Sequence, residues 1–279
     1  MDIFALILTS LLAVVSPAGL IADTVVENAL RSRFQDVETL EVRIDNTPSY
    51  QAVQGKIDRI RIASRGVQLR DDLRIEALEV ETDPLDLDLQ QLRKGGGGSF
   101  REAFRKPLQG AVRLVLTEED LNQTLQSPAI ANRLEQLVNR AIAGFAGSTG
   151  QQYQLLNPQL ELLEADRFRV KVQLRPARES EGEQPLDLML EAGLAVLEGQ
   201  QLQLLNPTVA VNGTPLPPRL TQGIIGQLSD RLNIGRLEDA GIISRILQLD
   251  LEENQVELAA FVRVEQLSPE SVESNRKLN

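Results

Sequence analysis

The sequence predicts an α+β fold built on antiparallel β-sheet, for three reasons. Many short segments alternate apolar and charged residues, which is the period of a half-buried strand. These segments follow one another in runs instead of alternating with helices, which argues against a doubly wound parallel sheet. Only three or four segments carry apolar residues at helical spacing. An antiparallel sheet with a few covering helices is therefore expected.

The chain opens on an uncharged stretch between Asp2 and Asp23. As a helix it would extend roughly 30 Å, about the thickness of the hydrocarbon core of a bilayer. We expect residues 1–22 to be a membrane anchor or an uncleaved signal, although Asp2 stands where a signal normally has basic residues. The alternative is a buried apolar helix. The nearest basic residues, Arg31 and Arg33, follow the stretch, and for an anchor this places the domain in the cytoplasm.

The domain is expected to cover residues 23–267 and to begin with a helix. From about residue 19 to 34, apolar residues such as Val26, Leu30 and Phe34 recur at helical spacing. The period then changes to two, which indicates a meander of short strands. At Leu78 the apolar phase slips by one residue, as a β-bulge would make it. The predicted strands are TLEVRI (39–44), IDRIRI (57–62), LRIEAL (73–78) and LDLDL (85–89).

The segment RKGGGGSFREAFRK (93–106) interrupts the strands. Four consecutive glycines exclude a helix or strand interior, so a mobile loop is expected. Five basic residues stand against one Glu, in a chain whose net charge is −11. Cations for anionic headgroups beside insertable rings predict membrane docking, and the alternative is a solvated loop whose rings pack into the core. The predicted membrane and headgroup contacts are Arg93, Lys94, Phe100, Arg101, Phe104, Arg105 and Lys106.

Two helices are predicted after the strand AVRLVL (111–116). Thr117 is placed to cap a short helix. Ser127 and Pro128 form a cap followed by proline at the first helical position, and the apolar stripe that follows ends at Gly144.

The second half of the chain is rich in predicted strands. They are RFRVKVQL (167–174), LDLMLEAGLAV (186–196) and a hairpin within 246–265, with a helix around residues 220–232 and a tight turn at Asn212-Gly213. The tetrapeptide LLNP occurs at 155–158 and at 204–207, which raises the possibility of a duplicated unit. Residues 268–279 are expected to be a disordered tail.

Composition excludes several functions. A net charge of −11 and a pI near 4.7 argue against nucleic acid as a partner, because phosphate binding needs a basic face. The chain contains neither Cys nor His, which removes disulfides, thiolate chemistry and the Ser–His dyad. The acidic cluster at Asp83, Asp86 and Asp88 lacks a calcium-binding loop. No catalytic residue, cofactor or metal site is predicted, although a hydrolase that uses a carboxylate pair stays open as an alternative.

An ordered series of weak motifs resembles one known family. The series covers roughly residues 15–265, and it resembles the phospholipid-binding family that includes lipomannan elongation factor A, in its cyanobacterial branch. No single motif is diagnostic, and the order of the motifs carries the resemblance. They are SPAGLIADTVVENALRSRF, NTPSYQAVQGKIDRIRIASRGVQL, LRIEALEVETDPLDLD, GAVRLVLTEEDLN, LLNP and NPTVAVNGTPLPP.

The resemblance implies a non-enzymatic lipid binder with a fold similar to the tubular lipid-binding proteins. In that fold a long, curved antiparallel sheet wraps one or more helices and leaves an apolar groove. The family is described for envelope proteins, which suggests the extracytoplasmic side, whereas the charges after the N-terminal stretch favour the cytoplasm. Both sides stay open. The implied partners are a phospholipid and a membrane surface, in lipid carriage or membrane maintenance.

The alternating strands agree with this resemblance without proving it. The apolar face of a sheet must be covered, either by helices in an ordinary core or by acyl chains. Burial of each acyl methylene contributes about 0.8 kcal/mol, so no special polar motif is needed. The alternative to a lipid binder is a membrane-tethered scaffold with a packed core. The predicted groove lining is Leu40, Val42, Ile44, Ile60, Ile62, Val170, Val172, Leu188, Leu190, Val256, Leu258 and Val262.

Overall fold

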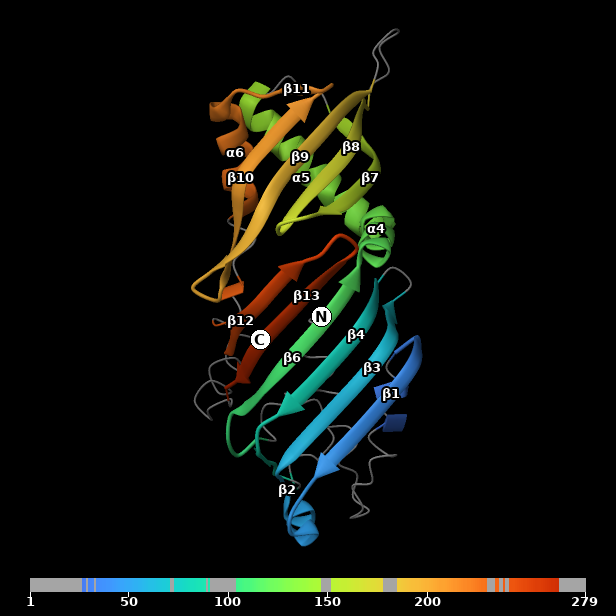
Figure 1. Ribbon diagram of the computed structural model, residues 1–279, viewed down its shortest axis with the longest axis vertical. Helices are drawn as coiled ribbons and strands as arrows, with labels where there is room; N and C mark the ends of the chain where they lie inside the picture. The colour runs from blue at the N-terminus through green and yellow to red at the C-terminus, as the bar shows by residue number, and fades with distance from the viewer. Residues whose placement is uncertain are drawn as a thin grey trace, which may run out of the picture.

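A computed structural model shows an elongated molecule in which two antiparallel sheets follow one another along the long axis (Figure 1). The N-terminal stretch 1–22 and the tail 268–279 lie outside the residues that the structure describes. In the part that is described, no helix is long and apolar enough to cross a membrane. The described residues are 27–28, 30–32, 34–70, 73–88, 90, 104–146, 152–177, 185–229, 234–235, 238 and 241–265.

The first sheet has six strands and combines the two ends of the described chain. Its order is β1-β3-β4-β6-β13-β12, and every neighbouring pair is antiparallel. The five-stranded sheet is inserted in sequence between β6 and β12. The strands are β1 (Asp36–Asp45), β3 (Arg59–Arg70), β4 (Leu73–Thr82), β6 (Leu108–Thr117), β12 (Ile242–Leu251) and β13 (Gln255–Val264).

One end of this sheet carries short elements. The 3-10 helix η1 (Ser49–Gln54) precedes β2 (Lys56–Ile57), which pairs with β5 (Leu85–Asp86). The strand predicted over 85–89 is therefore shorter than expected. The reason is that Leu87 leaves β5 and forms an isolated bridge with Phe104.

The second sheet has five strands in the order β11-β10-β9-β8-β7. The predicted turn at Asn212-Gly213 is confirmed, since both residues have positive φ (48° and 75°), as a type I′ hairpin turn requires. The strands are β7 (Tyr153–Leu163), β8 (Arg167–Pro176), β9 (Leu186–Leu197), β10 (Gln201–Val211) and β11 (Thr214–Pro215).

The repeated LLNP motif forms the same structure twice. In β7 the register shifts between Leu156 and Gln159, and in β10 it shifts between Leu205 and Thr208. Asn157 and Asn206 adopt left-handed conformations, with φ of 49° and 45°. Asn tolerates this conformation, and the proline after it suits a bulge because it has no N–H to donate. Both flanks of the five-stranded sheet are therefore bent by the same short sequence.

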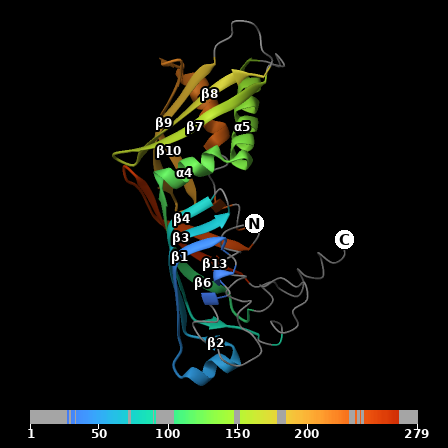
Figure 2. The same ribbon diagram turned by 90° about the vertical axis from the view of Figure 1, so that its right-hand side faces the viewer.

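In the part of the chain that the structure describes, three helices accompany the second sheet: α4 (Glu118–Gln126), α5 (Pro128–Ala146) and α6 (Pro218–Ser229). The predicted cap is confirmed, because Thr117 Oγ1 accepts a hydrogen bond from Asp120 N at 3.1 Å. The end predicted at Gly144 is wrong, since α5 continues to Ala146; a glycine in the last turn is tolerated at a cost of about 1 kcal/mol. Helices α5 and α6 lie on one side of the sheet (Figure 2).

The buried core belongs mainly to the six-stranded sheet. Residues such as Ile60, Ile62 and Leu78 are at most 3% exposed and belong to one cluster that draws on β1, β3, β4, β6 and β13. The phase slip predicted at Leu78 is present, because Ile75 and Leu78 are both buried. It is not a bulge there, however, since β3 and β4 keep their register from Arg61 to Gln68.

Hydrogen bonds join the two halves of the molecule where the two sheets meet. Glu118 N at the start of α4 donates to Asn254 O at 2.8 Å, and Leu251 N donates to Asp166 Oδ1 at 3.0 Å. On the other flank, Ile246 N donates to Gly199 O at 2.6 Å. The joint therefore uses turns and a helix end from both halves.

Candidate functional site

The helix-facing side of the five-stranded sheet carries continuous rows of apolar side chains. Across β8 and β9, Val170 is opposite Leu190 and Val172 is opposite Leu188. The row that contains Val170 and Leu190 continues to Leu160 in β7 and to Val209 in β10. Because strand residues alternate between faces, the intervening residues, including the charged Arg169 and Lys171, lie on the opposite face.

These apolar rows are incompletely buried. Val172 and Val209 are buried, but Val170, Leu188 and Leu190 remain partly exposed. The apolar stripe of α5 is also only half-buried, at Ile130, Leu134, Leu137 and Val138. In a closed core, facing apolar side chains would exclude water from one another. Apolar residues on the sheet and on α5 are therefore partly accessible to solvent.

The two longer helices contact the two flanks of the sheet. Helix α5 packs against β7 and helix α6 packs against β10, the two flanks of the sheet, and the helices also contact each other. In the view of Figure 1, α5 crosses behind the central strands β8 and β9. Figure 1 shows the two helices behind the sheet, converging toward its outer end.

Two helical side chains hold α4 on the edge of the sheet. Asn122 Nδ2 donates to Leu160 O at 2.9 Å, and Leu160 N donates to Asn122 Oδ1 at 2.8 Å. Glu118 Oε2 accepts from Leu162 N at 2.7 Å. An edge strand otherwise exposes such groups to other chains, so the two side chains replace a neighbouring strand.

Helix α5 repeats this arrangement further along β7. Asn139 Nδ2 donates to Tyr153 O at 2.8 Å, and Tyr153 N donates to Asn139 Oδ1 at 2.7 Å. Glu135 Oε2 accepts from Leu155 N at 3.1 Å. In both helices Glu precedes Asn by four residues, so the two side chains share one helical face.

Sequence reasoning missed these four residues, Glu118, Asn122, Glu135 and Asn139. The available signal is the repeated Glu-x-x-x-Asn spacing in consecutive helices. That spacing alone does not reveal which strand edge the side chains reach, so its meaning depends on the fold.

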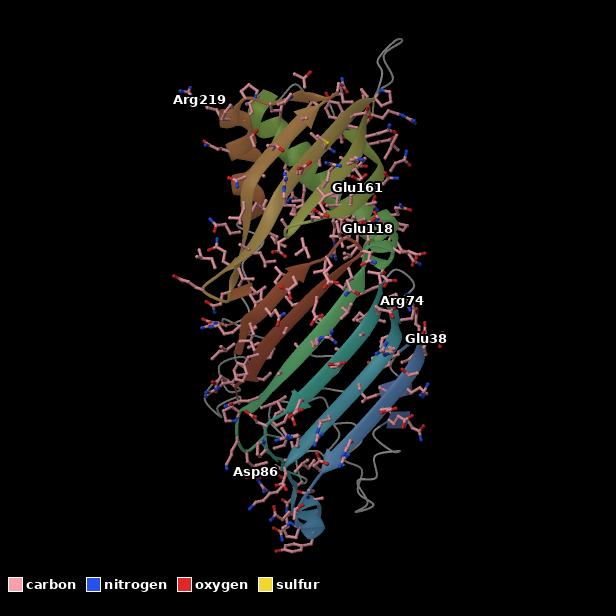
Figure 3. All side chains as sticks on the ribbon, in the orientation of Figure 1. Glu38, Arg74, Asp86, Glu118, Glu161 and Arg219 are labelled. Carbon is pink, nitrogen blue, oxygen red and sulfur yellow. The ribbon has the colours of Figure 1, made fainter. Side chains whose placement is uncertain are left out.

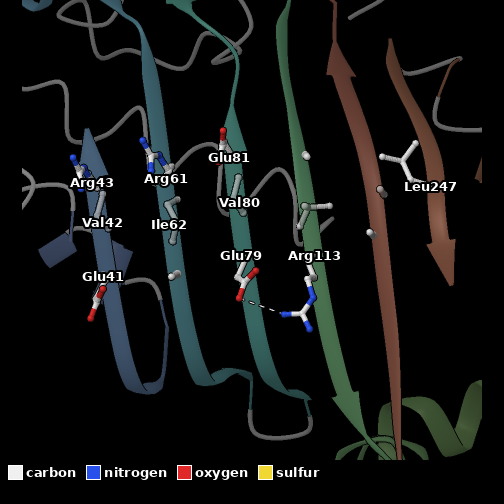
Figure 4. A pocket seen from close by; sticks show the side chains of 15 residues that line it. Glu41, Val42, Arg43, Arg61, Ile62, Glu79, Val80, Glu81, Arg113 and Leu247 are labelled. Atoms are coloured by element: carbon white, nitrogen blue, oxygen red, sulfur yellow. Dashed lines mark hydrogen bonds and ion pairs between the residues drawn. The ribbon is translucent and has the colours of Figure 1, made fainter. Parts of the chain in front are cut away.

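Three hollows lined by described residues lie on other surfaces. The outer face of the six-stranded sheet has a hollow of about 470 Å³ with Ala63, Ala111 and Ala259 among its lining residues (Figure 4). Its rim carries Arg113, which binds Glu257 through Nε–Oε1 at 2.6 Å and Glu79 at 3.3 Å. Two further hollows, of about 480 and 620 Å³, have mixed polar linings on β7–β9 and beside α4.

Carboxylates on the outer faces are held in the ionised form. The Arg113 hydrogen bond lowers the pKa of Glu257, and the Lys171 hydrogen bond, with a further one from Arg169, lowers the pKa of Glu161. A general acid needs the opposite shift, toward neutral pH. These carboxylates suit structural ion pairs.

The twelve predicted groove residues divide between the two sheets. Val170, Val172, Leu188 and Leu190 come together on β8 and β9. The others belong to the six-stranded sheet, where Ile44 packs against the core and Val256 and Leu258 are half-buried. The remaining five, Leu40, Val42, Ile60, Ile62 and Val262, are buried within that core.

The predicted membrane-contact segment is described only at its end. Arg93, Lys94, Phe100 and Arg101 lie outside the described residues. Phe104 is 6% exposed and packs in the six-stranded core, which is the alternative considered for the rings of this segment. Arg105 lies 3.5 Å from Asp86 (Nη1–Oδ1), and Lys106 is exposed.

Comparison with known proteins gives one match. A family model described as LmeA-like phospholipid-binding matches residues 13–261, most of the chain. No curated protein and no solved structure matches.

Proposed function

The chain belongs to the LmeA-like phospholipid-binding family, and from that premise we propose that it acts at a membrane, where it holds phospholipid acyl chains without a chemical step. Such a protein would take part in lipid carriage or in membrane maintenance. The family match supports the ligand class.

The proposed acyl-chain site is the space between α5 and α6 over the central strands β8 and β9. Its floor would include Val170, Val172, Leu188 and Leu190, which line up across the two strands. The observation that carries this proposal is the partial exposure of apolar residues on the sheet and on α5 where they face each other. Burial of about ten methylenes there would contribute about 8 kcal/mol.

The other eight residues of the groove prediction are less suited to lipid in this conformation. Five of them already pack against other side chains, so acyl chains could reach them only after the core opened. Val256 and Leu258 are half-buried and stay available as an extension of the site along β13.

We propose that residues 1–22 hold this site close to its lipid supply. The sequence supports an anchor through its uncharged stretch, which is long enough to reach across a bilayer as a helix. A variant lacking residues 2–22 should move from the membrane fraction to the soluble fraction. Retention of that variant in the membrane fraction would remove this part of the proposal.

Native mass spectrometry of the purified protein tests the lipid site. The wild-type protein should carry an added mass that dissociates as an intact phospholipid, and Leu190→Arg should lose it because a cation would then lie among the acyl chains. Met189→Arg is the matched control, since the neighbouring side chain lies on the opposite face of β9. A wild-type protein free of lipid even after incubation with phospholipid vesicles would contradict the proposal.

A further inference from the structure

Helices α5 and α6 form a basic layer in an acidic protein. Together they carry Arg133, Arg140 and Arg219 against the single acid Glu135, a net charge of +2 (three positive, one negative), whereas the whole chain carries −11. The preceding helix, α4, has the opposite character, with Glu118, Glu119 and Asp120 in its first turn. Charge is therefore segregated along the helical side of the molecule.

The three arginines of this layer differ from most other arginines of the described chain. Elsewhere in the described chain most arginines are ion-paired, for example Arg113 with Glu257 and Arg169 with Glu191. Arg133, Arg140 and Arg219 are exposed, and none of them pairs with an acid among the residues that the structure describes. Figure 3 shows Arg219 at the outer end of the molecule, directed away from the ribbon.

The geometry of the helices places these charges on an outer surface. Arg133 and Arg140 are seven residues apart, which is two turns, so they share one stripe of α5. Glu135 belongs to a different face, because its carboxylate accepts the hydrogen bond from Leu155 N. Leu220, next to Arg219, is 38% exposed and is among the few large apolar side chains that are this accessible.

We propose that the outer surface of α5 and α6 docks on an anionic phospholipid bilayer. Arg133, Arg140 and Arg219 would bind lipid phosphates, and Leu220 would enter the boundary between headgroups and acyl chains. This inference rests on the proposed function, because it places the opening between the two helices at the membrane from which lipid enters. Each basic residue near an anionic membrane surface strengthens binding about fivefold at moderate salt.

The first test compares two charge variants of the full chain on vesicles. Arg133→Gln/Arg140→Gln/Arg219→Gln should bind vesicles containing phosphatidylglycerol about a hundredfold more weakly than wild type. The matched control Lys56→Gln/Arg65→Gln/Arg175→Gln removes the same charge from exposed residues outside the helical layer, and it should bind nearly as wild type. Equal losses in the two variants would show an effect of net charge alone and would overturn the proposal.

A second test reads the docking surface directly and does not depend on an anchor. The chain contains no Cys, so a single cysteine can be introduced and labelled with an environment-sensitive fluorophore. A label at Gln136→Cys, between the two α5 arginines, should shift to the blue on phosphatidylglycerol vesicles and not on phosphatidylcholine vesicles. A label at Gln203→Cys, on β10, should not respond. A response at position 203 in place of 136, or an equal response to both lipids at 136, would overturn the proposal.

Lipid content separates this inference from the proposed function. If the triple arginine variant keeps its co-purified phospholipid and also keeps wild-type vesicle binding, the docking surface is wrong and the lipid site stands. If the wild-type protein never carries lipid, the proposed function fails whatever the vesicle result.

Discussion

The two halves of the molecule use the same kind of strand and reach different degrees of closure. In the six-stranded half, alternating strands bury their apolar faces in one cluster in which Ile60, Ile75 and Leu78 are about 1% exposed. In the five-stranded half, Val170, Leu188 and Leu190 alternate just as regularly and remain partly exposed. The alternation therefore sets which residues share a face, and the elements that cover the face decide how deeply those residues are buried.

Truncation of a large side chain should lower the free energy of unfolding most in the six-stranded half. Leu78→Ala is expected to lower the free energy of unfolding by about 3 kcal/mol, because it leaves a cavity in a packed core. Leu190→Ala should cost only about 1 kcal/mol, since its side chain is already partly exposed. Urea denaturation followed by circular dichroism measures both values. Equal losses would show that the two halves are equally closed.

Lipid binding should stabilise the five-stranded half selectively. At phospholipid concentrations a hundredfold above the dissociation constant, local stability at the site should rise by about 2.7 kcal/mol. Hydrogen exchange should then slow at amides of β8 and β9 and stay unchanged in β3 and β4. Uniform protection of both sheets would contradict a site confined to the five-stranded half.

Removal of a side chain that hydrogen-bonds to the edge of β7 should have the next largest effect on stability. Asn122→Ala removes two hydrogen bonds to Leu160 and should lower stability by about 2 kcal/mol. Hydrogen exchange at the amide of Leu160 should accelerate. Gln123→Ala, on an exposed neighbouring position, is the control and should have little effect. Unchanged exchange at Leu160 in the Asn122 variant would argue that another group seals this edge.

The smallest effect is expected from the outer ion pairs of the five-stranded half. The pKa of Glu161 is lowered, so its contribution to stability is fully present above the ordinary value of 4.5 and is lost as the pH falls through the lowered pKa. Glu161→Gln should therefore reduce the acid sensitivity of unfolding below pH 4.5 and should also remove a small stabilisation at neutral pH. Thermal unfolding measured from neutral to acid pH, with the exposed Glu164→Gln as control, provides the comparison.

Local features of the fold could be predicted from the sequence because they depend on neighbouring residues. Strand periodicity, the cap at Thr117 and the turn at Asn212-Gly213 are of this kind. The family could also be recognised, from the order of weak motifs.

Features that depend on distant partners could not be predicted in the same way. Alternation indicates which residues share a face, but it does not indicate that β13 lies between β6 and β12. It also does not indicate that only four of the twelve predicted groove residues belong to the five-stranded sheet. The sequence around Phe104 does not distinguish a buried ring from an exposed one, and the fold places the ring in the core of the six-stranded sheet. The role of Asn122 and Asn139 depends on the edge strand beside them.

The pairing of β13 with β6 has a consequence for biosynthesis. Leu108 is paired with Val264, so the six-stranded sheet stays incomplete until Val264 has left the ribosome. The inserted half, whose strands are contiguous in sequence, can form earlier during translation. Until then one side of β6 has no neighbouring strand. A chaperone would be most useful at this stage, because such an edge can pair with other chains.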